Sequence, residues 1–378
     1  MIFFHKKNFS LLILITLFCV FLNLFFLFLT KYQFDFFVNE QFSNLTKVNF
    51  FKQQKIPKQE VKALYLTAYS AGLDSKTDQI IDLMEKTELN AVVIDIKDYT
   101  GFVLYDSNLP IVNEFGLEKN LLGDLKKIIK KFHEKNIYVI ARQTVFQDPI
   151  LAEKKDDWAI KNKFGGIWRD YKGLSWVDPS KKDVWKYNLD IAREATKFGF
   201  DEINFDYVRF PSDGDLNTVF YENQTQNKNE IMADFFSYLD ESLKNYPVWI
   251  SIDFFGFVME RQDGMSIGQT LAGAIDKVDF ICPMMYPSHY PSGHLGLQNP
   301  ADYPYLVIDN GMKKAENVFK NSKRTQVRPW IQAFNIGAVY DAEKIRAQID
   351  AIEKYDNNGF MLWNAANRYT EAGLKQEN

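Results

Sequence analysis

The sequence contains little cysteine and no large excess of charge of either sign. Its 378 residues include two cysteines, Cys19 and Cys282, too few for a disulfide framework or a cysteine-rich zinc site. The formal net charge is −4 and we find no basic stripe, so nucleic acid is not expected as a partner. Hydrophobic residues make up 46% and charged residues 25%, which excludes global disorder.

One long uncharged run lies near the N-terminus. Residues 11–29 carry no charge and are numerous enough to cross a bilayer as a helix. Lys6 and Lys7 precede the run, and positive residues tend to stay on the cytoplasmic side. No small-residue cleavage site follows, so we expect an uncleaved signal-anchor; a long cleaved signal peptide is the alternative. Both interpretations export the rest of the chain, and the first predicts a single-pass protein of the cell membrane.

This run sets the predicted domain organisation. Residues 1–30 form the cytoplasmic flank and the membrane-spanning anchor, which makes the membrane one expected partner. Residues 31–60 lack clear periodicity and are interpreted as a stem. Residues 61–378 hold all the recurrent β-rich segments and are expected to form one extracytoplasmic domain.

Eight short apolar segments recur in this domain, and each is typical of a buried strand. They span 61–69, 91–98, 138–146, 202–210, 248–256, 279–287, 327–334 and 359–367. Successive segments start 30 to 64 residues apart, a spacing that suits helical crossovers rather than hairpins. Amphipathic helices are predicted over 121–136, 183–199 and 341–359. The pattern predicts a (β/α)8 TIM barrel. An open doubly wound sheet is the rival, but it requires a G-x-G-x-x-G turn that is absent.

Alternation along the predicted strands indicates which side chains face the barrel axis. Ile203 and Phe205 should face the outer helices, so Asn204 and Asp206 should face inward. The same rule assigns further polar residues to the axis: Asp95, Lys97, Arg142, Ser251, Asp253 and Gln332. Barrel interiors are ordinarily filled with Val, Ile and Leu, and buried charges are costly unless they pair or act. The polar interior therefore predicts a site at the mouth.

Asp206 and Asp253 are the candidate catalytic pair. They lie on consecutive strands, about 4.8 Å apart in a sheet. Their carboxyl groups can reach about 5–5.5 Å, as in retaining glycosidases; inverting enzymes need about 6.5–9.5 Å. We expect Asp206 to be ionised, beside Arg209, Lys97 or Arg142, and Asp253 to be the acid against an apolar wall of Phe254 and Phe255. The alternative is a pair of solvated aspartates that bond to basic residues.

Aromatic and polar residues near the strand ends are candidate sugar-binding groups, because pyranose faces are rich in C–H bonds. The candidates are Trp168, Trp176, Tyr286, His289, Trp363 and Asn364, beside Asp95, Lys97, Arg142, Asn204, Arg209 and Gln332. For any single tryptophan, packing in the core is the competing interpretation. His289 and His294 are five residues apart, which does not match H-E-x-x-H, so we predict neither a metal site nor a cofactor.

At these residues the sequence resembles a bacterial "putative glycosyl hydrolase domain" family of unknown function, a group related to the α-amylase-like barrels. The resemblance covers about residues 61–370. It rests on VVIDIKDYTG (92–101), GFDEINFDYVRFPSDG (199–214), CPMMYPSHY (282–290) and GFMLWNAANRY (359–369). It implies a (β/α)8 barrel and a glycosidase role, with Asp206 and Asp253 where α-amylase-like barrels carry the nucleophile and the acid. That acid is usually Glu.

Our leading hypothesis is a glycoside hydrolase that acts on an extracytoplasmic polysaccharide or cell-wall glycan with paired carboxylates. A carbohydrate-binding barrel without turnover is the second hypothesis, since it needs the aromatic groups but not both carboxylates in place. A metal-dependent polysaccharide deacetylase is the third, and it requires a metal at His289, His294 and an aspartate.

Overall fold

Eight parallel strands close into a barrel in the computed structural model, which describes residues 55–222 and 226–376. The strands are β1 (Val61–Leu66), β2 (Ala91–Lys97), β3 (Tyr138–Thr144), β5 (Glu202–Asp206), β7 (Trp249–Phe255), β8 (Phe280–Met284), the pair β9 (Gln326–Val327) and β10 (Trp330–Gln332), and β11 (Gly359–Trp363). β9 and β10 together act as the seventh barrel strand. Pairing of β10 with β8 and β11, and of β11 with β1, completes the ring, which confirms the predicted barrel.

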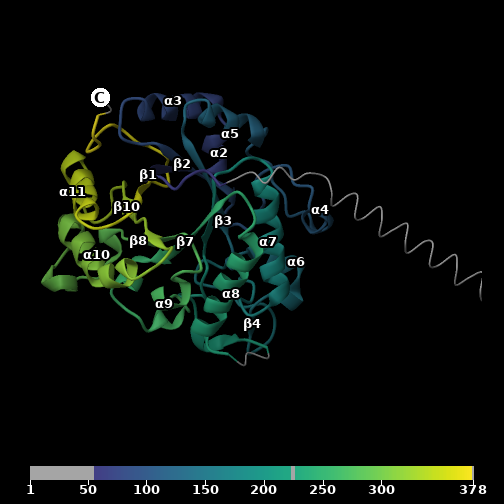
Figure 1. Ribbon diagram of the computed structural model, residues 1–378. Helices are drawn as coiled ribbons and strands as arrows, with labels where there is room; N and C mark the ends of the chain where they lie inside the picture. Colours follow the sequence, from purple (N-terminus) through teal and green to yellow (C-terminus); the bar gives the residue numbers. More distant parts are fainter. Residues whose placement is uncertain (1–54, 223–225, 377–378) are drawn as a thin grey trace, which may run out of the picture. The chain divides into compact units, whose positions relative to one another are not determined.

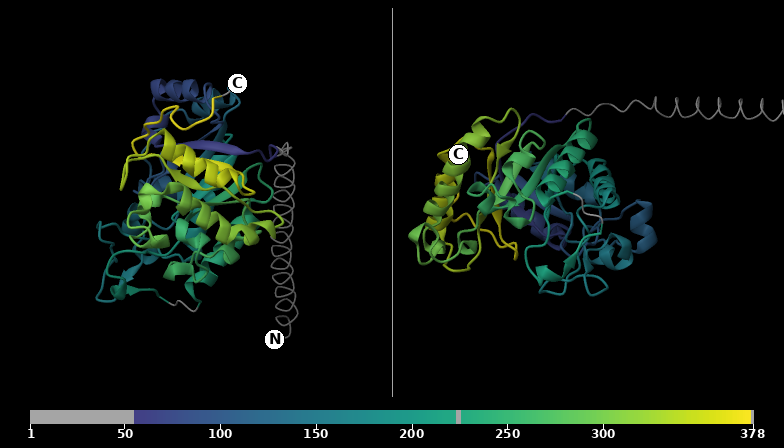
Figure 2. Two further views of the ribbon diagram at one scale, coloured as in Figure 1. Left: turned by 90° about the vertical axis from the view of Figure 1, so that its left-hand side faces the viewer. Right: turned by 90° about the horizontal axis from the view of Figure 1, so that it is seen from below.

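Helices lie outside the strands (Figure 1). They are α2 (Ala68–Ala71), α3 (Asp74–Met84), α4 (Pro110–Phe115), α5 (Leu125–His133), α6 (Pro149–Lys154), α7 (Lys182–Thr196), α8 (Lys228–Leu243), α9 (Leu271–Ala274), α10 (Pro304–Lys320) and α11 (Ala342–Glu353). Two short strands, β4 (Lys161–Asn162) and β6 (Val219–Phe220), form a separate antiparallel pair. After the last strand, the chain runs back beside the turn that follows α3, where Gln376 bridges Thr87 (Figure 2).

Local sequence signals explain several helix boundaries. The apolar face of α5 is buried as its periodicity predicts, and Asp124 caps its first turn by accepting from the Lys127 N–H. A capping box between Asn227 and Glu230 starts α8. The helix expected over 341–359 ends earlier, at Glu353. Gly359 instead begins β11 at φ +87°, where a Cβ would lie 2.0 Å from the Val61 carbonyl oxygen.

The two faces of the barrel strands differ as the alternation predicts. Ile203, Phe205, Ile250 and Ile252 are buried in the large apolar layer between strands and helices. The interior holds a smaller apolar cluster that consists of Val61, Ala63, Tyr65, Ala91, Val93, Tyr138, Ile140, Phe280, Cys282, Tyr286, Trp330 and Met361. Cys282 is a buried strand residue, as expected.

A buried group of charged and polar side chains fills the end of the barrel interior where the strands begin. Arg328 donates from Nη1 to both carboxylate oxygens of Glu202 at 2.9 Å, and Tyr138 donates its hydroxyl to the same carboxylate at 3.0 Å. All three side chains are buried. Barrel sites lie at the opposite end. We therefore interpret the Arg328–Glu202 pair as part of the structural core.

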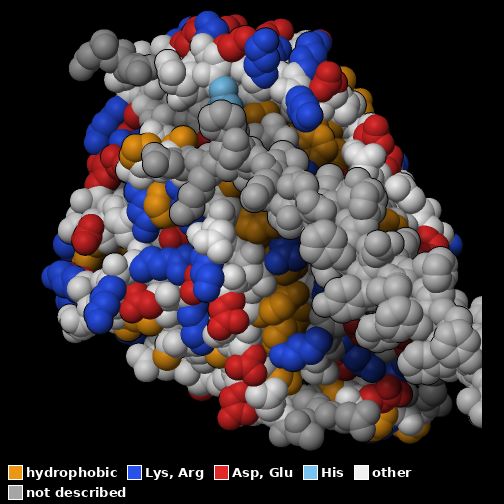
Figure 3. All heavy atoms as spheres, turned by 45° about the vertical axis from the view of Figure 1, so that its right-hand side comes forward, with side chains coloured by type: hydrophobic (Ala, Val, Ile, Leu, Met, Phe, Trp, Pro, Cys, Tyr) orange, Lys and Arg blue, Asp and Glu red, His pale blue; other side chains and the backbone are white. Residues whose placement is uncertain are grey.

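The predicted membrane anchor, residues 11–29, and most of the predicted stem lie outside the described residues. Within residues 55–222 and 226–376, no helix has the length and apolar character needed to cross a membrane. The last stem residues contact the barrel: the Trp249 indole donates to the Ile56 carbonyl at 3.1 Å, and Lys58 donates to the Arg324 carbonyl at 2.8 Å. On the face in Figure 3, basic and acidic side chains lie side by side among the coloured atoms.

Candidate active site

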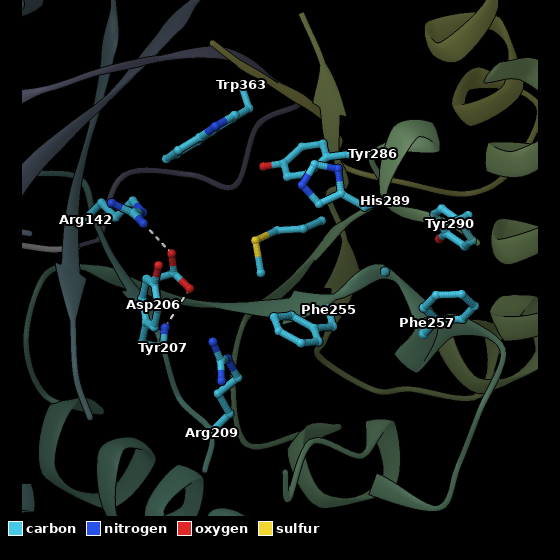
Figure 4. A pocket seen from close by; sticks show the side chains of 12 residues that line it. Arg142, Asp206, Tyr207, Arg209, Phe255, Phe257, Tyr286, His289, Tyr290 and Trp363 are labelled. Atoms are coloured by element: carbon cyan, nitrogen blue, oxygen red, sulfur yellow. Dashed lines mark hydrogen bonds and ion pairs between the residues drawn. The ribbon is translucent and has the colours of Figure 1, made fainter. Parts of the chain in front are cut away.

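A pocket of about 430 Å³ opens at the carboxyl ends of the strands, where barrel enzymes carry their sites (Figure 4). It is lined by Arg142, Asp206, Tyr207, Arg209, Phe255, Gly256, Phe257, Met284, Tyr286, His289, Tyr290 and Trp363. Of the twelve, one is a carboxylate, two are arginines and most of the rest are aromatic. Tyr286 and His289 lie across the pocket from Asp206 (Figure 4). This composition suits a polar ligand that has flat apolar faces.

Arg142 connects three aspartates. Its Nη1 donates to Asp95 Oδ1 at 2.5 Å, its Nη2 donates to Asp206 Oδ2, and its Nε lies 3.7 Å from Asp253 Oδ2. All four side chains are buried. The predicted inward orientation of Arg142 is thereby confirmed, and one guanidinium gathers acidic groups from β2, β5 and β7. Such a buried group is stable only if the positive charge of the arginine is matched by the negative charge of the aspartates that are ionised.

Asp206 is placed at the pocket wall by an unusual backbone turn. The next residue, Tyr207, has φ +53°, a left-handed conformation that non-glycine residues rarely adopt. This turn lets the Tyr207 N–H donate to Asp206 Oδ1 at 2.5 Å, while Arg142 holds Oδ2. Both carboxylate oxygens are therefore fixed in direction. Strained backbone of this kind concentrates at functional sites.

Asp253 lies deeper than the sequence predicts. It faces the axis on β7, next to β5, but it is fully buried and does not line the pocket. Asn204 and Trp330 donate to its Oδ1 at 2.9 and 2.8 Å, and Oδ2 has no hydrogen-bond partner. Burial, with a further contribution from the charge of Asp206, raises the pKa of Asp253 well above its usual range. Asp253 therefore lies below the mouth rather than in it, where we expected the acid of the pair.

Asp95 is the second buried acid of the group. Tyr65 donates its hydroxyl to Asp95 Oδ2 at 2.5 Å, opposite the bond from Arg142. Burial raises the pKa of Asp95 to about 6, although both partners act in the opposite direction. Asp95 was predicted to contact substrate. It lies behind Arg142 and orients this arginine rather than lining the pocket.

The prediction that Lys97 shares the inner face with Asp95 is wrong. The pairing of β2 with β3 shifts register between these two residues, so the alternation is broken before Lys97. Lys97 Nζ instead binds Asp148 Oδ2 at 2.8 Å, and both side chains are fully buried. It also donates to the Thr144 carbonyl and lies 5.7 Å from the ring of Tyr187 on α7, outside the barrel. Lys97 is part of the scaffold around the strand ends.

Three other predicted contacts have structural partners. Asn204 is fully buried and donates to Ser251 and Asp253. Gln332 is fully buried and connects loops: it accepts from the Ser288 N–H and donates to the Phe334 and Ile336 carbonyls. Asn364 fixes the turn after β11 by donating to the Ala333 and Arg368 carbonyls. Neither Gln332 nor Asn364 is among the residues that line the pocket.

Trp168 and Trp176 were predicted as sugar-binding groups, but they lie in the core, which was the competing interpretation. Each is 1% exposed, because the loop after β3 folds its indoles into the core. Trp168 donates to the Asp215 carbonyl, and Trp176 donates to Asp170 at 3.1 Å. Trp363 does line the pocket. Its ring stacks on Tyr65 at 4.0 Å between centroids, and the Arg142 guanidinium lies 5.1 Å from it.

Several pocket residues were not predicted. Tyr207, Phe257, Met284 and Tyr290 lie at strand ends or in the loops after β7 and β8, where strand alternation no longer applies. Phe255 was named as an apolar wall and does line the pocket, since it follows Asp253 by two residues, whereas Phe254 points into the outer core. Strand alternation could have predicted this difference, because Phe255 shares the face of Asp253 and Phe254 lies on the opposite face.

His289 lies on the pocket wall with Tyr286, as expected of substrate-contacting residues, and its Nδ1 is 3.0 Å from the Ser288 hydroxyl. Burial lowers the pKa of His289 and raises that of Tyr286 well above its usual range. His294 contacts Glu260 at 3.3 Å instead. Within the described part of the chain, no three His, Cys, Asp or Glu side chains are arranged to hold a metal ion.

The closed parallel barrel, with a pocket of acidic, basic and aromatic groups at its carboxyl end, defines a TIM-barrel protein. The sequence matches the family described as "Putative glycosyl hydrolase domain" over residues 63–369, and the chain belongs to this family. No curated protein matches the sequence.

Two of the solved structures that match have TM-scores above 0.5 and agree on the fold. The glycoside hydrolase domain of PgaB (BpsB) from Bordetella bronchiseptica is 14% identical, with a TM-score of 0.59 over 82% of this chain and 95% of that one. An α-galactosidase from Thermus thermophilus in complex with stachyose is 12% identical, with a TM-score of 0.51 over 85% of this chain and 65% of that one. A hypothetical protein from Ruminiclostridium thermocellum is 43% identical over 50% of this chain and 96% of its own, with a TM-score of 0.47.

Proposed function

We propose that this chain is a glycoside hydrolase in which Asp206 acts on the anomeric carbon of a sugar bound in the pocket. The observation that supports this most directly is the position of Asp206. Within the described residues it is the one carboxylate that lines the pocket, and both of its oxygens are held by fixed donors. A carboxylate so oriented attacks the anomeric carbon or activates the water that does. The family and the barrel fold are consistent with this chemistry.

The surrounding groups have distinct parts in this proposal. Arg142 and the Tyr207 N–H orient Asp206, and the rings of Trp363 and Phe255 offer apolar surface to the sugar. Asp253 supports Arg142 and Asn204 from below as a protonated acid. Tyr286 and His289 lie on the facing wall, where a hydrogen-bond donor to the leaving oxygen belongs (Figure 4).

The experiment is a screen of the full-length protein against polysaccharides for release of reducing ends. Asp206→Asn keeps the size of the side chain but removes its charge and replaces one of its two acceptor oxygens by an NH2 donor. It should lower the rate by roughly 10²–10⁴-fold. Asp157→Asn is the matched control, since Asp157 is exposed and distant in the sequence from the barrel strands. Hydrolysis that Asp206→Asn leaves unchanged would refute the assignment.

A carbohydrate-binding barrel without turnover is the second candidate, and the burial of Asp253 favours it. Only one carboxylate of the expected pair reaches the pocket, whereas paired-carboxylate glycosidases present two. Binding of a glycan with no new reducing ends, unchanged in Asp206→Asn, would support this candidate.

We also place the barrel outside the cytoplasm, on a single-pass anchor formed by residues 11–29. The support is the uncharged run and the lysines before it. The substrate is then a surface or cell-wall glycan. Protease added to intact cells, after removal of the cell wall, should digest the barrel; protection of the barrel until the membrane is opened would contradict this placement.

A further inference from the structure

Arg209 differs from the other buried arginines because, among the described residues, no carboxylate lies within ion-pair distance of it. Its side chain is 8% exposed and lines the pocket. Arg142 and Arg328 each contact at least one carboxylate, but within residues 55–222 and 226–376 no ion pair involves Arg209. Burying an arginine with no carboxylate in direct contact is costly, so such a residue needs a reason.

Hydrogen bonds to neighbouring groups involve only one of the three guanidinium nitrogens of Arg209. Nη1 donates to the Phe210 carbonyl and to the Ser212 hydroxyl, both at 3.1 Å. Nε and Nη2 have no hydrogen-bond partner among the described residues, and neither atom is sealed from solvent. These two nitrogens are the adjacent pair that binds a planar oxyanion with two parallel hydrogen bonds.

Three aromatic rings hold the guanidinium in place. Its central carbon lies 4.7 Å from the ring of Phe255, 4.8 Å from that of Trp176 and 5.3 Å from that of Tyr207. Figure 4 shows the side chain reaching up between Tyr207 and Phe255 into the pocket. Cation–π contacts stabilise the charged form and fix its plane, but they add no hydrogen-bond acceptor. The guanidinium is thus oriented before any ligand arrives.

Charge balance shows which kind of ligand fits. Arg142 is shared among Asp95, Asp206 and Asp253, so its charge is already offset. Arg209 lies at the pocket wall three residues after Asp206. Asp206, Asp213 and Asp170 act on it only from beyond ion-pair distance, so its guanidinium has no carboxylate bound to it. We propose that Arg209 binds an acidic group, a carboxylate or a phosphate, on the glycan, so that the substrate of this pocket is an anionic polysaccharide. The claim that the anionic polysaccharide is a substrate rests on the proposed function. The claim that it binds at Arg209 does not.

The test measures binding and needs no turnover. Full-length protein is titrated with D-glucuronate, D-glucose 6-phosphate and neutral D-glucose, at low and high salt. At least one acidic sugar should bind about tenfold more tightly than glucose, and salt should reduce the difference. The stronger of the two acidic sugars identifies the acidic group as carboxylate or phosphate.

Variants separate recognition from a structural role. Arg209→Gln should remove the preference for acidic sugars while changing glucose binding less than about twofold, and Arg209→Lys should keep part of it, because the charge stays and the fork is lost. Arg261→Gln is the matched control: it removes the same charge from an exposed pair with Asp263 and should keep the full preference. A purely structural Arg209 would instead weaken all three ligands equally.

Equal affinities for the three sugars in the wild type, absence of binding by all of them, or a preference that survives in Arg209→Gln would each overturn the proposal. Its failure is distinguishable from failure of the proposed function. Preference for acidic sugars without any polysaccharide cleavage leaves the Arg209 site in place and refutes the hydrolase. Cleavage of a neutral glycan, with no acidic preference, does the reverse.

Discussion

Trp330 donates its indole N–H to Asp253 Oδ1 over 2.8 Å, inside a barrel that hides both side chains from water. Trp330 also lies edge-on to Trp363 and Tyr65, so this bond connects the aromatic groups of β1, β10 and β11 to the acidic group of β5 and β7. The interior therefore carries polar and aromatic contacts as one layer beneath the pocket. Breaking a bond in this layer leaves a buried acceptor short of a donor.

Trp330→Phe should lower the free energy of unfolding by about 1–3 kcal/mol for the donor that Asp253 loses, and by a further amount for the space that the smaller ring leaves in the interior. Urea denaturation of the full-length protein measures the loss. Trp249→Phe is the control, since its indole donates to the Ile56 carbonyl at the surface, and it should cost less than about 1 kcal/mol. Equal losses in the two variants would show that the buried bond is not special.

Asp95 should make the protein less stable as the pH rises from about 4 to about 6. Its folded-state pKa is raised to about 6 from a usual value of 3.8. Below pH 4 both states hold the proton; between the two pKa values the unfolded chain releases it first, so unfolding becomes easier. The full effect is about 3 kcal/mol above pH 6.

Asp95→Asn isolates this contribution, since asparagine does not titrate. The stability of the wild type minus that of the variant should fall between pH 4 and pH 7, and then level off. Urea denaturation at four or five pH values gives the curve. A difference that stays flat, or rises with pH, would mean that Asp95 keeps its charge in the folded protein.

Strand periodicity predicted the part of the site that lies within regular strands. Asn204, Asp206 and Arg142 face inward because a period of two holds wherever the ladder is unbroken. The same rule failed at Lys97, because a register shift in β2 is set by how the strands close and leaves no mark in the local sequence.

Loop residues were beyond this reasoning for a different reason. The indoles of Trp168 and Trp176 are buried by a loop whose path depends on contacts with Asp215 and Asp170, which no periodicity encodes. Tyr290 and Phe257 come together from loops after different strands, with ring centroids 4.6 Å apart. The depth of a side chain in the barrel could not be predicted either. Alternation placed Asp253 on the correct face of β7, but it could not show that Asp253 lies below the pocket, next to Arg142.

The Lys97–Asp148 pair should act on stability and not on substrate. Lys97→Met or Asp148→Asn alone leaves a charge buried without its partner, at a cost of about 3–5 kcal/mol. The double variant removes both charges and should lose less than the sum of the single losses. Additive losses, measured by urea denaturation, would contradict a direct interaction. A raised KM in Lys97→Met, at full folding, would restore Lys97 as a substrate contact.

Asp253→Asn should separate the two aspartates of the predicted pair. Because burial favours the protonated form of Asp253, asparagine is a near match for it in charge and shape. Asn204 and Trp330 keep an oxygen to bond, so the fold and Arg142 should stay in place. We expect hydrolysis to remain within about tenfold of the wild type, against the roughly 10²–10⁴-fold loss in Asp206→Asn. Equal losses in the two variants would instead make Asp253 the proton donor, reached when Arg142 moves aside.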